Sequence, residues 1–294
     1  MSKKKHRKRK RLRWILLSLI TLLPIVLIVL LSIPIATTFN VSVQTELVTY
    51  EVTDAVNSKL PFRNAIKYNI DGDSIGVFEG DFKASVGAII NVERIAHGPL
   101  SVQIVGKDTS SAGSYYSPYT DFKTGDAPNF IEFVISNIND GVNDGVTHII
   151  PINGEVTLGR NIAYETYGNS TALLRQGEVV VIGKSLLSNN YYKSATYDLN
   201  IGDEFMIIEP QSKAYGFATI NENAGMTVAY KVIGKEGRIL TPGPRDNTSG
   251  YPIALSFLSK VENDSFFKGI SLCIALLISL ATIIPFFSGY YDGK

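Results

Sequence analysis

The chain has 294 residues, with 28 Lys and Arg against 27 Asp and Glu and a formal net charge of +1. This balance averages two oppositely charged parts, because nine basic residues lie between Lys3 and Arg13 and two more are Lys268 and Lys294. The residues from Thr37 to Phe267 keep 17 basic and 26 acidic residues, so nucleic acid is excluded as an expected partner. The single cysteine, Cys273, allows no disulfide and no Cys-rich zinc site in that middle region.

A basic head at residues 1–13 precedes an uncharged apolar stretch at residues 14–36. About twenty apolar residues, at ~1.5 Å each, cross a hydrocarbon layer of ~30 Å, so this stretch predicts a transmembrane helix with the head in the cytoplasm. A cleaved signal peptide has the same order of parts, but its apolar core is shorter and ends in small residues. Since Ile35–Thr38 is a poor cleavage site, we expect an uncleaved signal anchor, with the cleaved signal peptide as the alternative.

Residues 37–267 predict an extracytoplasmic all-β region. Val41–Val48 and Leu100–Val105 alternate apolar with polar residues, which is typical of half-buried strands. Further strands are expected at Ala88–Val92, Phe130–Ile135, Thr147–Ile152, Val179–Ile182, Phe205–Ile208, Phe217–Ile220 and Met226–Ile233. Helical turns are expected only around Asp54–Leu60 and Thr171–Gln176. Many short strands between Gly, Asn, Asp and Pro clusters indicate an antiparallel sandwich, jelly roll or barrel.

The segment 137–145 is the richest break in the middle region, and it is interpreted as a hairpin tip or a boundary between two sandwiches. Asp140, Asn143 and Asp144 in this segment are the candidate calcium ligands, because hard cations prefer several oxygen ligands close together. Asn-Asp-Gly is also the commonest turn chemistry. No cofactor is therefore expected, and calcium is kept as the alternative.

No catalytic residue is assigned from the sequence. The Gly-x-Ser-x-Gly, His-Glu-x-x-His and phosphate-binding-loop motifs are absent. His97 and His148 are isolated from each other in the sequence and are more often structural in such a setting.

Two tyrosine-rich segments are the candidate ligand-binding sites. Tyrosine supplies contact area with little loss of entropy, and short polar neighbours adapt to a partner, so such loops suit recognition. The alternative is that these segments are edge strands that pack on their own sheet. The candidate residues are Tyr115, Tyr116, Tyr119, Asn189, Asn190, Tyr191 and Tyr192.

Residues 268–287, which carry no charge after Lys268 and have aromatic residues at both ends, predict a second transmembrane helix that returns the tail, 288–294, to the cytoplasm. Ser271, Ala275 and Ser279 lie four apart on one helix face, and small residues let helices approach closely in lipid. The partner would be the first span or the same face of a second copy, which gives a homo-oligomer. The alternative is that these residues are simply common in membrane helices.

The sequence therefore predicts a two-pass cell-membrane protein with both termini in the cytoplasm and an all-β region outside. The expected function is a non-enzymatic binding or assembly module, in contact with the lipid bilayer and with a membrane or cell-envelope protein or a glycan. A cell-surface hydrolase without a known motif is the alternative. A clustered acid, base and nucleophile would favour the enzyme, and a flat aromatic surface would favour binding.

Overall fold

The computed structural model describes residues 18, 21–22, 24–32, 37–54, 59–117, 119, 122–136, 149–159, 172–185, 187–208, 212–220, 223–241 and 250–291. The basic head, much of the predicted first span and the segment 137–145 with Asp140, Asn143 and Asp144 lie outside the described residues. The chain divides into two compact units. The β-unit comprises Thr37–Val181 and Thr196–Ala254, and the helix unit comprises Met1–Ala36, Ile182–Ala195 and Leu255–Lys294.

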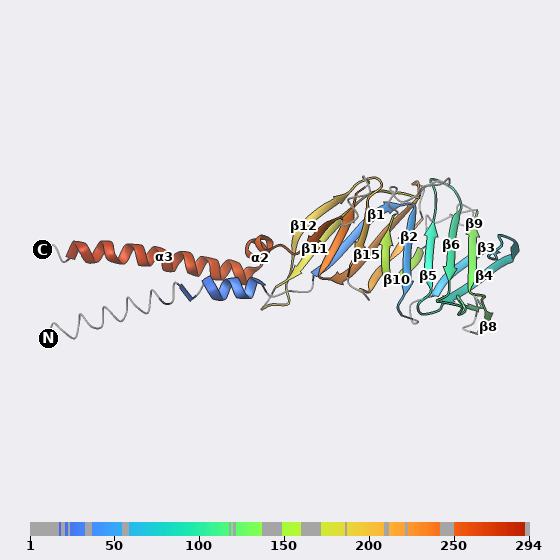
Figure 1. Cartoon of the computed structure of the whole chain (residues 1–294), viewed down its shortest axis with the longest axis horizontal. Helices are drawn as coiled ribbons and strands as arrows, with labels where there is room; N and C mark the ends of the chain where they lie inside the picture. The colour runs from blue at the N-terminus through green and yellow to red at the C-terminus, as the bar shows by residue number, and fades with distance from the viewer. Residues whose placement is uncertain are drawn as a thin grey trace. The chain divides into compact units, whose positions relative to one another are not determined.

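Short strands make up most of the described chain (Figure 1). They are β1 (Thr37–Thr45), β2 (Leu47–Val52), β3 (Lys59–Tyr68), β4 (Ser74–Ala84), β5 (Ile89–Glu93), β6 (Leu100–Val105), β7 (Gly113–Tyr116), β8 (Lys123–Asp126), β9 (Phe130–Ile135), β10 (Ile149–Leu158), β11 (Leu174–Lys184), β12 (Tyr191–Leu199), β13 (Glu204–Ile207), β14 (Ala214–Thr219), β15 (Met226–Gly234), β16 (Glu236–Leu240) and β17 (Tyr251–Ala254). The prediction of an all-β middle region is confirmed for the described residues of Thr37–Ala254, whereas the end of the predicted region, residues 257–267, belongs to helices.

Antiparallel pairing joins twelve strands into a continuous series. Its order is β1, β15, β14, β10, β2, β5, β6, β9, β3, β4, β7, β8. A second series leaves the C-terminal end of β10 through β13 and β16 to β17. The pairing of β10 with β2 therefore links β2–β9 to the strands after residue 137, whereas β1 pairs directly with β15.

Two local predictions are wrong because tertiary contacts override the local pattern. Val41–Val48 is not one strand, since the chain turns at Glu46, where the Thr45 hydroxyl donates to the Leu47 carbonyl (2.9 Å). The predicted helical turn at Thr171–Gln176 is instead the start of β11, because Leu174 is fully buried in the sheet core. Lys59 and Leu60, at the end of the other predicted turn, begin β3.

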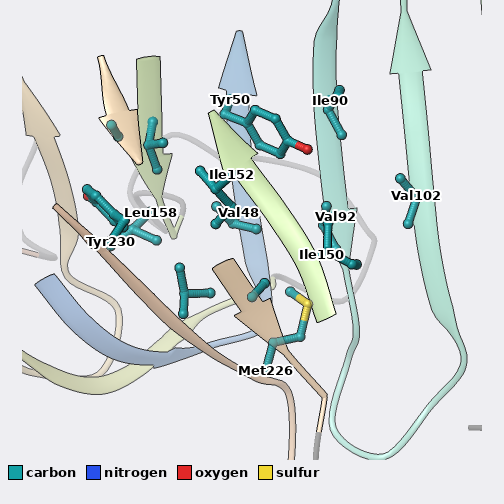
Figure 2. Packing of buried hydrophobic residues seen from close by; sticks show 14 of the residues in the cluster. Val48, Tyr50, Ile90, Val92, Val102, Ile150, Ile152, Leu158, Met226 and Tyr230 are labelled. Atoms are coloured by element: carbon teal, nitrogen blue, oxygen red, sulfur yellow. The ribbon is translucent and has the colours of Figure 1, made fainter. Parts of the chain in front are cut away.

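The core of the β-unit is formed by inward side chains that alternate along neighbouring strands. Figure 2 shows Ile150 and Ile152 of β10 in one cluster with Val48 and Tyr50 of β2. The buried Tyr50 hydroxyl donates to the Pro151 carbonyl (3.1 Å), so this phenol satisfies its polar atom inside the core. Burial raises the pKa of Tyr50, which keeps it neutral.

The corner between β1 and β2 holds a buried carboxylate, Glu46, that is 4% exposed. It accepts hydrogen bonds from the backbone amides of Ala96 (3.0 Å) and Leu173 (3.2 Å) and from the Arg175 guanidinium (2.6 and 3.1 Å). The Glu46 backbone donates to the Leu173 carbonyl and accepts from the Arg94 amide, each at 2.9 Å. One residue thus joins the β1–β2 corner, the loop after β5 and the start of β11.

Arg94 extends this connection to the turn before β15. Its buried guanidinium donates to the carbonyls of Asn223 (3.0 Å) and Gly225 (2.8 Å), and to that of Gly98 (3.3 Å). The Gly225 amide in turn donates to the Ala96 carbonyl (2.6 Å). We call Glu46, Arg94 and Arg175 with these backbone groups the corner network.

Besides the helical residues 24–32, the helix unit contains two C-terminal helices joined by a sharp bend. α2 (Phe257–Asn263) begins after Ser256, whose hydroxyl accepts from the Ser259 amide (3.0 Å), and α3 spans Ser265–Tyr291. Between them the buried Asp264 accepts from the Phe266 amide (2.9 Å) and from the Ser185 hydroxyl (2.7 Å). A carboxylate at a helix N-terminus is favourable for the helix dipole, so Asp264 fixes the start of α3.

In the part of the chain that the structure describes, no helix on its own combines the length and apolarity needed to cross a membrane. α2 and the Ser265–Leu280 part of α3 meet that test together, as a pair bent by 83°.

The corner network predicts an acid-sensitive contribution to stability. Burial alone would raise the pKa of Glu46, but the Arg175 and backbone hydrogen bonds lower it below its ordinary value of 4.5. We expect Glu46→Gln to lower the free energy of unfolding by ~2 kcal/mol near pH 7, because charged hydrogen bonds to a buried group are lost. A carboxylate whose pKa is lowered by folding stabilises the fold at pH values above its ordinary pKa. That contribution disappears as the pH falls through the lowered pKa. The difference between parent and variant should therefore shrink in acid, as measured by urea unfolding of the purified chain.

Glu236→Gln is the matched control, since the Glu236–Arg238 ion pair (3.2 Å) has side chains that are about 40% exposed. Its effect should stay within ~0.5 kcal/mol. Equal effects of the two substitutions at neutral pH would contradict the role assigned to Glu46.

Candidate binding surface on the outer face of the sheet

The strands β10, β14, β15 and β1 are successive neighbours in the β-unit, and their register defines which side chains share a face. Residues directly opposite each other on antiparallel strands lie on the same side of a sheet. One row consists of Asn153, Tyr215, Lys231 and Asn40, and the next of Pro151, Phe217, Ala229 and Ser42. The alternate residues Ile152, Ala218, Val228 and Val41 are buried in the core. The two rows therefore belong to the side of the sheet turned away from the core, which we call the outer face.

Two aromatic residues lie at the centre of the outer face. Tyr215 is 51% exposed and Phe217 is 47% exposed. Two residues apart on one strand, they are separated by ~7 Å along β14, a spacing that forms a continuous aromatic platform. Ile149 of β10, on the same face as Phe217, is 51% exposed as well. Apolar side chains gathered on a regular sheet surface are typical of interaction sites.

The sequence of β14 dictates that these rings point outward. The strand reads Ala-Tyr-Gly-Phe-Ala-Thr, with small residues at the inward positions and aromatic residues at the outward ones. A Cβ on Gly216 would lie 2.1 Å from the Ala229 carbonyl oxygen and 2.4 Å from the Tyr230 Cβ. Because no side chain fits at position 216, this stretch of β14 carries only small residues on its core side. Tyr215 and Phe217 occupy the opposite, outer side.

Polar groups border the platform. Lys231 and Asn40 are exposed in the same row as Tyr215. Asn153, directly opposite Tyr215, is only 3% exposed, and among the described residues neither atom of its side-chain amide has a hydrogen-bond partner. A buried amide without partners costs ~1–3 kcal/mol. The outer face therefore combines aromatic rings with an ammonium group and amides, which suits contact with a partner that is both apolar and hydrogen-bonding.

The first predicted tyrosine group contains one residue of the core. Tyr115 on β7 is half-buried against Phe78 (5.3 Å between ring centroids) and Phe82 (5.4 Å), and Lys67 lies over its ring at 5.2 Å. Burial raises the pKa of Tyr115. Tyr116 has the Lys59 ammonium 5.7 Å from its ring centroid, and Tyr119, in the turn after β7, is 87% exposed.

The second predicted group belongs to the helix unit, whereas the first belongs to the β-unit. Asn189 and Asn190 are exposed in the turn before β12, and the Asn190 carbonyl accepts from the Ser185 amide (2.9 Å). Tyr191 is 62% exposed. The Tyr192 ring covers Gly183, where a Cβ would lie 2.5 Å from the ring, and its buried hydroxyl has no hydrogen-bond partner in the part of the chain that the structure describes. Burial, with a further contribution from the charge of Asp264, raises the pKa of Tyr192 to about 12.

The small residues of α3 lie on a mostly exposed side of that helix. Ala275 and Ser279 are exposed and Ser271 is half-buried, and the Ser279 hydroxyl donates to the Ala275 carbonyl (2.9 Å). Packing through these residues stays a prediction.

Sequence reasoning missed Tyr215 and Phe217, although Phe217–Ile220 was predicted as a strand. The available signal was the alternation of aromatic and small residues through Ala214–Thr219, which is the reverse of a strand with large residues inside.

Within the described residues no group of three or more His, Cys, Asp or Glu side chains is placed to bind a metal. Searches of protein-family models, of curated proteins and of solved structures found no match to this chain.

The tyrosines of the first group are expected to differ in their effect on stability. Tyr115→Ala should lower the free energy of unfolding by ~3 kcal/mol, because it removes a ring packed on two others and leaves a cavity. Tyr119→Ala, at a position 87% exposed, should change it by less than ~0.5 kcal/mol. Thermal unfolding of the purified chain measures both, and similar losses would show that Tyr119 is also structural.

Proposed function

We propose that this chain is a membrane-tethered binding or assembly module whose β-unit, outside the cytoplasm, recognises a protein or glycan partner through its outer face. The observation that carries the proposal is the exposure of Tyr215 and Phe217 side by side on a regular strand. Their strand is held on both sides, by β10 and β15, so the platform is rigid before binding. A rigid aromatic surface loses little entropy when a partner covers it.

The charged groups of the β-unit support binding over catalysis. The most concentrated set of buried charges, the corner network, has its hydrogen bonds directed to backbone groups and to its own members. Such a network holds chain segments together and leaves Glu46 no role as a general base. The exposed aromatic surface has the character expected of a recognition site, with polar groups at its border.

The membrane tether is supported by the side chains of the helix unit. Large apolar residues are exposed along both helices, which is unfavourable in water and favourable in hydrocarbon. They are Leu22, Ile25, Val26, Ile28 and Val29 near the N-terminus and Leu272, Leu276, Ile278, Leu280 and Ile283 on α3. We therefore propose two membrane-crossing segments with both termini in the cytoplasm.

Replacing both rings of the platform should abolish most of the binding. We expect Tyr215→Ser with Phe217→Ser to weaken binding at least tenfold, because central aromatic residues dominate interface energies. A photoreactive phenylalanine at position 217 in intact cells identifies a protein partner as a discrete adduct. Retention of the purified chain on immobilised envelope polysaccharide measures binding to a glycan partner. The parent and the substituted chain are then compared in the assay that detects binding.

The control for this test is Tyr119→Ser with Phe122→Ser, which removes one tyrosine and one phenylalanine that are 87% and 76% exposed elsewhere on the β-unit. This variant should bind as the parent does. Loss of binding in the control with full binding in the Tyr215 and Phe217 variant would move recognition to the β7–β8 turn and overturn the proposed site.

The proposed topology is tested with tags at both ends. Protease added to intact cells, or to spheroplasts where an outer envelope blocks access, should spare both tags and cut between Thr37 and Ala254. The reason is the basic head beside an uncharged stretch, which favours the cytoplasmic side. A C-terminal tag removed by external protease would contradict the two-span topology.

A further inference from the structure

The end of the N-terminal helix (residues 24–32) is bound by a buried lysine of α2. The Lys260 ammonium donates a hydrogen bond to the Leu31 carbonyl (2.9 Å), and Lys260 is only 6% exposed. The Leu31 side chain is 2% exposed, although most of its helix is exposed. Both residues belong to the helix unit.

This contact has the chemistry of a helix C-terminal cap. The last four carbonyls of a helix have no partner within the helix, and they carry the negative end of its dipole. A lysine ammonium close to them satisfies a carbonyl and is attracted by that dipole. A buried lysine is costly without such acceptors, and burial lowers the pKa of Lys260. Removal of the N-terminal helix would therefore deprive Lys260 of the Leu31 carbonyl.

The exposure pattern of the two helices is complementary. The less exposed residues of the N-terminal helix are Pro24, Leu27, Leu30 and Leu31, and those of α3 between residues 267 and 277 are Phe267, Ile270, Ser271, Ile274 and Leu277. Each set recurs every three or four residues, so each forms one stripe. The hydrogen bond from Lys260 to the Leu31 carbonyl places this part of the N-terminal helix beside α2.

The two stripes also match in depth. In an antiparallel pair, residues at equal depth have numbers with a constant sum, because both helices rise ~1.5 Å per residue. Leu31 and Phe267 are the most buried described residues of their helices. Aligning these two places Leu27 level with Ser271 and Pro24 level with Ile274, and all of these residues belong to the less exposed stripes.

We propose that the N-terminal helix is retained in the mature protein, where it packs against α3 of the same chain. Lys260 and Phe267, on the two sides of the bend between α2 and α3, form the surface that binds the Leu31 end of this helix. Cleavage of the N-terminal helix as a signal peptide would remove the segment that this surface binds. The inference does not depend on what the outer face of the β-unit binds.

Engineered cysteines in the intact membrane-bound chain test this arrangement. In a Cys273→Ser background, Leu27→Cys with Ser271→Cys should form an intrachain disulfide on mild oxidation, at least fivefold faster than the control pair. The control is Ile28→Cys with Leu272→Cys, one residue further along each helix, where the side chains are 56% and 63% exposed. Lys260→Met, which keeps the apolar stem but removes the donor, should slow the first cross-link several-fold.

The mass of the mature chain is measured on the same samples and should include residues 24–32. Three results would overturn the proposal: a mature N-terminus after Leu31, equal cross-linking of both cysteine pairs, or a first pair that yields only disulfide-linked dimers. The last result would assign the partner helix to a second copy. None of these outcomes bears on partner binding by Tyr215 and Phe217, although a mature N-terminus after Leu31 would also remove the first membrane-crossing segment of the proposed topology.

Discussion

The β-unit depends on one buried carboxylate at the point where its first two strands separate. Glu46 interrupts what the sequence pattern presents as a single strand, so that β1 pairs with β15 while β2 pairs with β5 and β10. Its four hydrogen bonds and those of Arg94 hold together segments far apart in the sequence. Apolar packing alone tolerates shifts in register, whereas a buried charge must keep all its partners. The corner network therefore determines which strands become neighbours, at the cost of a dependence on pH.

That choice of neighbours produces the outer face. β14 lies between β10 and β15, and β1 closes the far side of β15, so every aromatic residue on the outer side of β14 is supported by paired backbone. Tyr215 and Phe217 contribute nothing to the core behind them, where Gly216 and Ala218 take up the space. Nearby, the side-chain amide of Asn153 is buried without a hydrogen-bond partner among the described residues. Local features that lower stability are more often found where a protein binds another molecule.

Regular alternation allowed the sequence to predict the all-β class and several strands, with β6 and β9 at their observed bounds. β3 and β4 were missed because bulges interrupt their pairing, at Phe62/Ala65 and Lys67/Tyr68, and the alternation is lost with them. The turn at Glu46 was missed because its cause lies in Ala96, Leu173 and Arg175, all distant in sequence. The tyrosine-rich segments attracted attention by composition, yet Tyr115 is engaged in packing and the clearer platform consists of only two rings on a strand. Composition locates aromatic residues, whereas only strand register shows which side of a sheet they occupy.

The helix unit uses the same physical device as the β-unit. At three places where the chain changes direction, a buried charged side chain forms hydrogen bonds: Glu46 with backbone amides at the β1–β2 corner, Asp264 with the Phe266 amide and the Ser185 hydroxyl at the 83° bend, and Lys260 with the Leu31 carbonyl of the N-terminal helix. Between two smooth apolar helices, dispersion contacts vary little as one slides along the other. A single ammonium bound to the last turn distinguishes one depth from the next, because a shift by one turn (~5.4 Å) breaks the hydrogen bond. Lys260 would thus fix the register of the helix pair, while the leucines and isoleucines supply most of the contact area.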